Sequence, residues 1–170
     1  MYITTEMKKK QVYSILIDNW DEEITGVFIA EGKEWIVLYD NQNDFLVEGF
    51  RFIRKQKIEE VLREEDECFK EKIFNLKYPK LSFNSLFNLD NTVALLKGIQ
   101  KQNTLLHFDT DDEEEIIVGK IEEVNLTNFK LKSLTSNGKW GESCSCDFSE
   151  ISSIAIQNDY LNSLSLLFQS

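Results

Sequence analysis

Alternation of hydrophobic and polar positions predicts short antiparallel strands in the first sixty residues. Tyr13, Ile15 and Ile17 alternate with polar residues, so their side chains share one face of a half-buried strand. The strand-like runs of this region lie at residues 13–18, 24–30, 34–39, 45–47 and 50–53. The polar, glycine-containing segment 31–33 predicts a hairpin between two of them. A β-meander is therefore expected.

Helical spacing of apolar residues replaces this alternation in the middle of the chain. A short strand near Ile58 is predicted to lead into a helix that extends to about Leu76. Pro79 follows, and proline disfavours helix in the residue before it. A second helix is predicted to begin after Asp90 or Asn91, either of which can cap it. The middle segment should therefore be a helical connector.

A second strand-rich region follows the connector. Its predicted strands lie at residues 105–108, 116–124, 128–134, 143–148 and 151–156. Ser136, Asn137 and Gly138 predict a turn in which glycine takes a positive φ. Helical spacing at Leu161 and Phe168 then predicts a terminal helix.

The two strand-rich regions share one apolar spacing. Gly26 and Gly119 each lie in an apolar run that follows an acidic stretch, and Ile58 and Ile151 each lie 32 positions after their glycine. A repeated spacing of this kind predicts a duplicated small β-module.

The apolar positions of both modules resemble those of Sm-like and SH3-like small barrels. The residues that carry the resemblance are Gly26, Phe28, Gly32, Trp35 and Ile36 in the first module and Gly119, Ile121, Asn125, Asn128 and Phe129 in the second. The resemblance covers roughly residues 11–62 and 104–157 and implies a pair of five-stranded barrels.

The polar residues characteristic of Sm-like proteins are missing from both modules. The position of the family's RNA-binding asparagine holds Ile36 or Phe129, and neither side chain can hydrogen bond a base edge. The family's Arg-Gly pair before the last strand is replaced by residues 147–150, Asp-Phe-Ser-Glu. The resemblance therefore implies a fold and not RNA binding.

The expected fold class is α+β and predominantly β, with two tandem five-stranded Sm-like or SH3-like small barrels. The first module spans residues 1–62, the helical connector 63–103, and the second module with its terminal helix 104–170.

Composition indicates an acidic globular protein. The 170 residues are 42% hydrophobic and carry a formal charge of −11, which repels nucleic acid and anionic lipid and favours a basic partner. Three cysteines do not form a disulfide framework in a chain of this length, so a cytoplasmic location is expected. No apolar run approaches the length of a membrane span, and we expect no membrane association.

Catalytic and metal-binding motifs are missing from the sequence. His107 is the sole histidine, and no Gly-x-Ser-x-Gly elbow accompanies it. The acidic run 109–115 lacks the glycine and glutamate of an EF-hand loop, so we interpret it as a solvated hairpin loop. Cys144 and Cys146 would share one strand face, as buried residues or with a redox or metal role. We predict no enzyme activity, no metal and no cofactor.

Candidate binding residues are one basic cluster and two tryptophans. The cluster comprises Arg51, Arg54, Lys55 and Lys57; Phe50 and Phe52 are expected to face inward and Arg51 outward. Trp20 and Trp140 lie in predicted loops, as interface anchors or as covers of a barrel end. We predict a non-catalytic protein-interaction module for a basic partner, for instance a basic nuclease or toxin. RNA binding through the basic cluster is the alternative.

Overall fold

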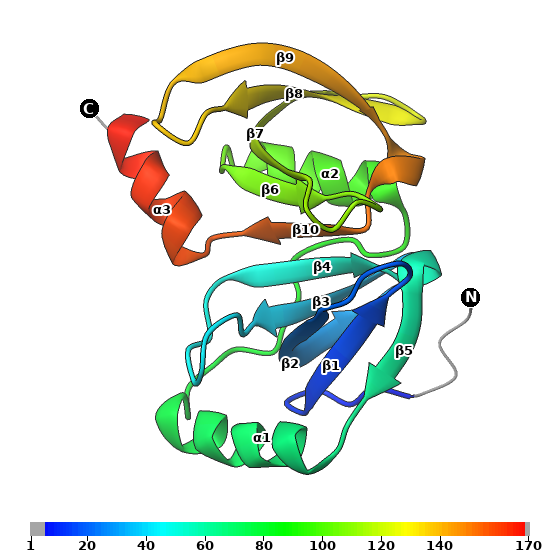
Figure 1. Ribbon diagram of the computed structural model, residues 1–170, viewed down its shortest axis with the longest axis vertical. Coiled ribbons are helices and arrows are strands. Elements are labelled where there is room, and N and C mark those ends of the chain that lie inside the picture. Colours follow the sequence, from blue (N-terminus) through cyan, green and yellow to red (C-terminus); the bar gives the residue numbers. More distant parts are fainter. Residues whose placement is uncertain (1–5, 169–170) are drawn as a thin grey trace.

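Ten strands form one continuous antiparallel sheet in the computed structural model, which describes residues 6–168 (Figure 1). The strands are β1 (Val12–Ile17), β2 (Glu23–Glu31), β3 (Trp35–Asp40), β4 (Phe50–Arg54), β5 (Ile58–Leu62), β6 (Leu106–Asp109), β7 (Ile116–Val124), β8 (Asn128–Leu134), β9 (Trp140–Asp147) and β10 (Ser153–Ile156). Their order across the sheet is β5-β1-β2-β3-β4-β10-β6-β7-β8-β9. Residues 45–47, predicted as a strand, instead belong to the loop before β4.

Three α-helices accompany the sheet and confirm the predicted α+β, predominantly β class. They are α1 (Glu65–Lys77), α2 (Thr92–Lys101) and α3 (Asp159–Ser165), and short 3₁₀ turns occupy Lys55–Lys57, Phe148–Glu150 and Leu166–Phe168. Asn91 caps α2 as predicted, because its side chain accepts a hydrogen bond of 2.8 Å from the backbone of Ala94. Within residues 6–168 no helix combines the length and the apolar character needed to cross a membrane.

The two groups of five strands have the same neighbour order. The order β5-β1-β2-β3-β4 in the first half recurs as β10-β6-β7-β8-β9 in the second. The register of β2 shifts between Phe28 and Ala30, and that of β7 shifts between Ile121 and Glu123. The first residue of each shift lies two positions after Gly26 or Gly119. Figure 1 shows the halves stacked along the long axis, and we call the junction where β4 pairs with β10 the seam.

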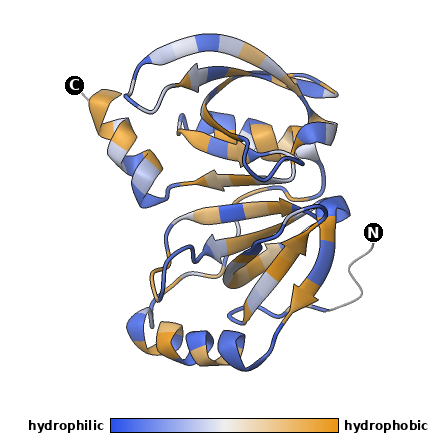
Figure 2. Cartoon of the chain, in the orientation of Figure 1, coloured by the Kyte–Doolittle hydropathy of each residue, from blue (hydrophilic) through white to orange (hydrophobic). Residues whose placement is uncertain are grey.

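The main hydrophobic core extends across the seam. Trp35 and Phe52 from the first half belong to the same buried cluster as Phe108 and Phe129 from the second. The helix α2 of the connector contributes to this cluster, and the Trp35 indole donates a hydrogen bond of 3.0 Å to Thr92 Oγ1. Figure 2 shows the hydrophobic segments on strands of both halves. The seam is therefore a packed region and not a flexible linker.

Strand β1 differs from the predicted half-buried strand because α1 packs against it. Ser14 lies on the face expected to be open to solvent, yet it is only 2% exposed. Its hydroxyl donates to Glu67 of α1 at 2.7 Å and also lies 2.8 Å from Thr25 Oγ1. Both faces of β1 are therefore covered, which sequence alternation alone does not reveal.

Candidate functional site

A polar cavity of about 480 Å³ opens at the seam. We call it the seam cavity, and its lining side chains come from both halves of the chain: Trp20, Glu22, Glu23, Ile24, Thr25, Asp40, Asn41, Gln42, Asn43, Arg51, Lys70, His107, Asp109, Glu113 and Ile116. Its floor is polar and buried, which makes it the strongest candidate for a functional site.

The register of β10 positions the floor of the cavity. Ala155 is paired with Arg51 of β4 on one side and with His107 of β6 on the other. Residues directly opposite each other in an antiparallel sheet project from the same face. Because the central side chain is only a methyl group, Arg51 Nη1 and His107 Nε2 approach to 3.3 Å. Ser153 lies opposite Asp109 in the same register and contacts its carboxylate.

One buried guanidinium joins two buried carboxylates on this floor. Arg51 Nη2 lies 2.8 Å from Asp109 Oδ2, and Arg51 Nη1 lies 3.3 Å from Asp40 Oδ2. The three side chains are between 3% and 9% exposed. Arg51 Nε also donates to Ser153 Oγ at 3.1 Å. With both carboxylates ionised the group carries one net negative charge, so it favours a cation in the space above it.

His107 is neutral in this arrangement. Arginine has only hydrogen-bond donors, so the Nε2 atom that faces Arg51 must act as acceptor and the ring proton lies on Nδ1. Burial lowers the pKa of His107, the Arg51 charge lowers it further, and Asp109 and Asp40 oppose the shift. The imidazole therefore presents an N–H donor.

Three side-chain atoms of the floor have no hydrogen-bond partner among residues 6–168: His107 Nδ1, Asp40 Oδ1 and Asp109 Oδ1. Within the same residues no side-chain nitrogen or oxygen is both buried and unpartnered. These three atoms are therefore open to the cavity that their side chains line. A ligand would find two carboxylate oxygens and one imidazole N–H there.

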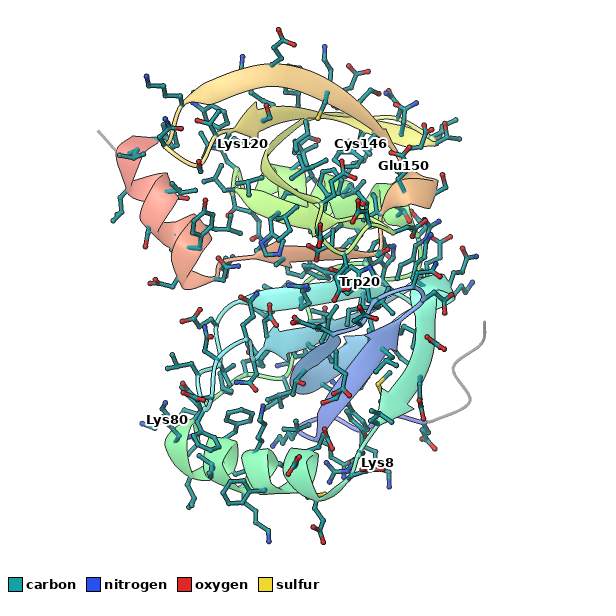
Figure 3. All side chains as sticks on the ribbon, in the orientation of Figure 1. Lys8, Trp20, Lys80, Lys120, Cys146 and Glu150 are labelled. Atoms are coloured by element: carbon teal, nitrogen blue, oxygen red, sulfur yellow. The ribbon has the colours of Figure 1, made fainter. Side chains whose placement is uncertain are left out.

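Trp20 forms part of the wall and connects the two halves. Its indole Nε1 donates to the carbonyl oxygen of Thr110 at 3.2 Å. The Glu113 carboxylate accepts hydrogen bonds of 2.9 Å from the backbone of Asp21 and of Glu22. The loop before β2 is thereby held against the loop before β7. Figure 3 shows Trp20 at the junction of the halves.

Carboxylates line the seam cavity and two further hollows. Glu23 also lines a neighbouring hollow at the start of α1, and the loop that carries Glu113 contributes to a further hollow, which Phe108 and Ile117 also line. We call these carboxylates the acidic face: Glu22, Glu23, Glu64, Glu65, Asp66, Asp111, Asp112, Glu113, Glu115 and Glu150. Among the described residues that line the three hollows, the cations are the buried Arg51 and Lys70.

The predicted basic cluster does not form a single exposed patch. Arg51 is 8% exposed and faces the seam cavity, so its expected outward orientation is wrong; both faces of β4 are covered. Arg54 donates to the carbonyl oxygen of Phe148. Lys55 pairs with Glu31 at 2.8 Å, and Lys57 pairs with Asp111 at 2.6 Å. The four basic side chains therefore all have intramolecular partners.

Trp140 is separated from the other predicted site residues. It begins β9, and its ring packs on that of Phe168 with centroids 5.0 Å apart. The structure thus brings Trp20 and Arg51 together in the cavity wall and leaves Trp140 elsewhere.

Neither a metal site nor a nucleophile–base pair is evident in residues 6–168. No group of three or more His, Cys, Asp or Glu side chains there is placed to hold a metal ion. Ser153 Oγ bonds Asp109 and Arg51, whereas His107 Nε2 faces Arg51, so serine and histidine are not paired with each other. Cys144 and Cys146 share a face of β9. Burial is the main cause that raises the pKa of the Cys146 thiol, and the nearby Cys144 adds to the shift, to a value of about 12.

Sequence reasoning missed the partners of Arg51. Asp40 follows the apolar run 35–39 directly, and Asp109 ends a buried strand, so each is a carboxylate at the end of an apolar strand. The position of each carboxylate at the end of an apolar strand was the feature of the sequence that could have indicated a buried ion pair. No local feature of the sequence marked Ser153, because its contacts depend on which strands lie on either side of β10.

The chain matches no protein-family model, no curated protein and no solved structure.

Proposed function

We propose that this protein is a non-catalytic interaction module whose acidic face binds a basic protein partner. The observation that carries the proposal is the set of ten carboxylates that line the seam cavity and two further hollows, whose described lining residues include the cations Lys70 and the buried Arg51. The net charge of −11 also favours a positively charged partner, because complementary potentials accelerate association and select partners.

RNA binding, the alternative from the sequence, has weaker support. Arg51, Arg54, Lys55 and Lys57 would have to give up intramolecular partners before they could bind phosphate. Sequence-independent affinity for nucleic acid depends on free basic side chains that displace counterions. A filter-binding assay with single-stranded RNA at low salt tests this alternative, and we expect no retention.

We further propose that each half is a small barrel-like module of common ancestry, in a cytoplasmic protein. The shared strand order and the register shift at one offset from Gly26 and from Gly119 support the duplication. The free state of Cys68, Cys144 and Cys146 is compatible with a reducing compartment.

Fluorescence anisotropy with a labelled oligolysine peptide tests the basic-partner proposal. We expect binding at low salt that weakens strongly at about 0.3 M NaCl, where charges are screened beyond a few ångströms. The double charge reversal Glu22→Lys, Glu23→Lys, at two exposed residues of the acidic face, should weaken binding at least tenfold. Its matched control is Glu123→Lys, Glu142→Lys, which changes the same charge at exposed positions outside the acidic face. Equal loss in both variants, or no binding by the unmodified protein, overturns the proposal.

A further inference from the structure

We propose that the seam cavity receives one arginine side chain of the basic partner, with its guanidinium between the Trp20 ring and the open carboxylate oxygens of Asp40 and Asp109. This inference rests on the proposed function and goes further by assigning a ligand class and the atoms that bind it.

The charge of the floor selects a cation. Two carboxylates face one guanidinium, and the neutral His107 adds no positive charge. The rim adds Glu22, Glu23 and Glu113 against the single Lys70. An anionic or neutral ligand would meet a net negative cavity, whereas a cation gains from it.

Open polar atoms on the floor supply a second, independent observation. His107 is 8% exposed, yet its Nδ1–H has no partner among residues 6–168 and lines the cavity. Asp40 and Asp109 each use only Oδ2 in the described hydrogen bonds, so each retains one oxygen for a ligand. A ligand that enters the cavity can bond these open atoms directly in place of water.

The cavity favours a guanidinium over an ammonium group. Asp40 and Asp109 both pair with Arg51 and both line the cavity, so two acceptors face the same space. A planar guanidinium donates in several directions at once and stacks on aromatic rings, while an ammonium is a compact and strongly hydrated charge. The Trp20 ring is held in the wall by its bond to Thr110 and is half-buried, so it can offer a face. The remaining His107 N–H suits a carbonyl oxygen of the partner's backbone.

His107 gives a direct experimental signal because it is the sole histidine of the chain. The experiment titrates the full chain with N-acetyl-arginine amide at low salt and follows the imidazole resonances of His107 by NMR. N-acetyl-lysine amide and N-acetyl-citrulline amide are the comparison probes. We expect saturable shifts with the arginine compound, about tenfold weaker binding of the lysine compound and no shift with the neutral citrulline compound.

Steric variants separate this inference from the proposed function. Ile116 is 58% exposed at the rim, so Ile116→Trp should narrow the entrance without changing the charge of the acidic face. Asn43→Trp, at another exposed rim position, is a second blocking variant in case the first fails to fold. Leu126→Trp is the matched control, because Leu126 is 87% exposed and does not line the cavity.

We expect both blocking variants to bind N-acetyl-arginine amide at least tenfold more weakly in the His107 titration, and the control variant to bind it as the unmodified protein does. If oligolysine binds in a salt-dependent way but the arginine compound leaves His107 unshifted, or if blocking has no effect, this inference fails and the proposed function stands. If oligolysine does not bind at all, the proposed function fails and the inference fails with it.

Discussion

Arg51 of β4 and Asp109 of β6 are joined by an ion pair of 2.8 Å that crosses over β10, the strand between them. The two residues are far apart in sequence and belong to different halves of the sheet. Arg51 also pairs with Asp40, so the seam carries buried charged side chains from both halves of the chain.

Replacement of Arg51 by methionine should destabilise the protein by about 3–5 kcal/mol, because it leaves two buried carboxylates without a counter-charge. Urea unfolding followed by tryptophan fluorescence measures the change. Lys130→Met at an exposed position of β8 is the control and should alter stability by less than about 0.5 kcal/mol. Adding Asp40→Asn and Asp109→Asn to Arg51→Met should recover part of the loss. Unchanged stability of the single variant would show that the carboxylates are not buried as charges.

His107 should make stability fall as the solution becomes acidic. Its pKa is lowered in the folded state by burial and then by Arg51, with Asp109 and Asp40 opposing. As pH falls below about 6.5, the unfolded chain takes up a proton that the folded protein refuses until its own lower pKa is reached. The unfolded state therefore binds more protons in this window, and the free energy of unfolding decreases.

His107→Gln removes that contribution. The measurement is the free energy of unfolding of both proteins between about pH 8 and pH 5. The unmodified protein should lose more stability than the variant over this range, and NMR titration should place the His107 pKa below about 6.5. A His107 pKa above that value would contradict the arrangement described for its ring.

Gly119 should be intolerant of a side chain, whereas Gly98 should accept one. A Cβ at Gly119 would collide with the carbonyl oxygen of Lys132, which belongs to the neighbouring strand backbone and cannot move aside cheaply. Gly119→Ala should therefore cost about 1–3 kcal/mol. In helix α2 a Cβ at Gly98 would meet only Phe87, at 3.6 Å, so Gly98→Ala should stabilise the protein by up to about 1 kcal/mol. Thermal unfolding of both variants checks the opposite signs.

Cys146 should resist alkylation in the folded protein. Burial is the main cause that raises its pKa to about 12, and Cys144 adds to the shift, so the reactive thiolate is scarce at pH 8. Iodoacetamide treatment followed by peptide mass spectrometry should leave Cys146 unmodified and label it only after unfolding in urea. Rapid labelling of Cys146 in the native protein would contradict its burial.

Local patterns in the sequence predicted most elements of this fold. The alternation in β1, the helical spacing of α1 and the cap at Asn91 each depend on residues close in the chain. The turn at Gly138 is also confirmed, with a φ of 76°. Such features are encoded where they occur, so periodicity and turn chemistry suffice to find them.

The candidate site depends instead on contacts between distant segments. The expected orientation of Arg51 assumed that one face of β4 is open to water, but the side chains of Asp40, Asp109 and His107 surround the guanidinium on that face, and Arg51 is only 8% exposed. Neither Asp109 nor Ser153 is marked as its partner by local spacing. Only the strand order places them together, and strand order is a property of the whole chain.

The place of β10 in the sheet also constrains how the molecule can be assembled. This strand follows the other nine in residues 6–168, yet it lies at the centre of the sheet, between β4 and β6. A growing chain must therefore carry Arg51, Asp40, His107 and Asp109 without the strand that aligns them until Ser153–Ile156 has been made. Pairing over such sequence separations is slow to form. Without Ser153–Ile156 the edges of β4 and β6 would stay open and their charged side chains would not be aligned, so the floor of the seam cavity forms only after all ten strands have been made.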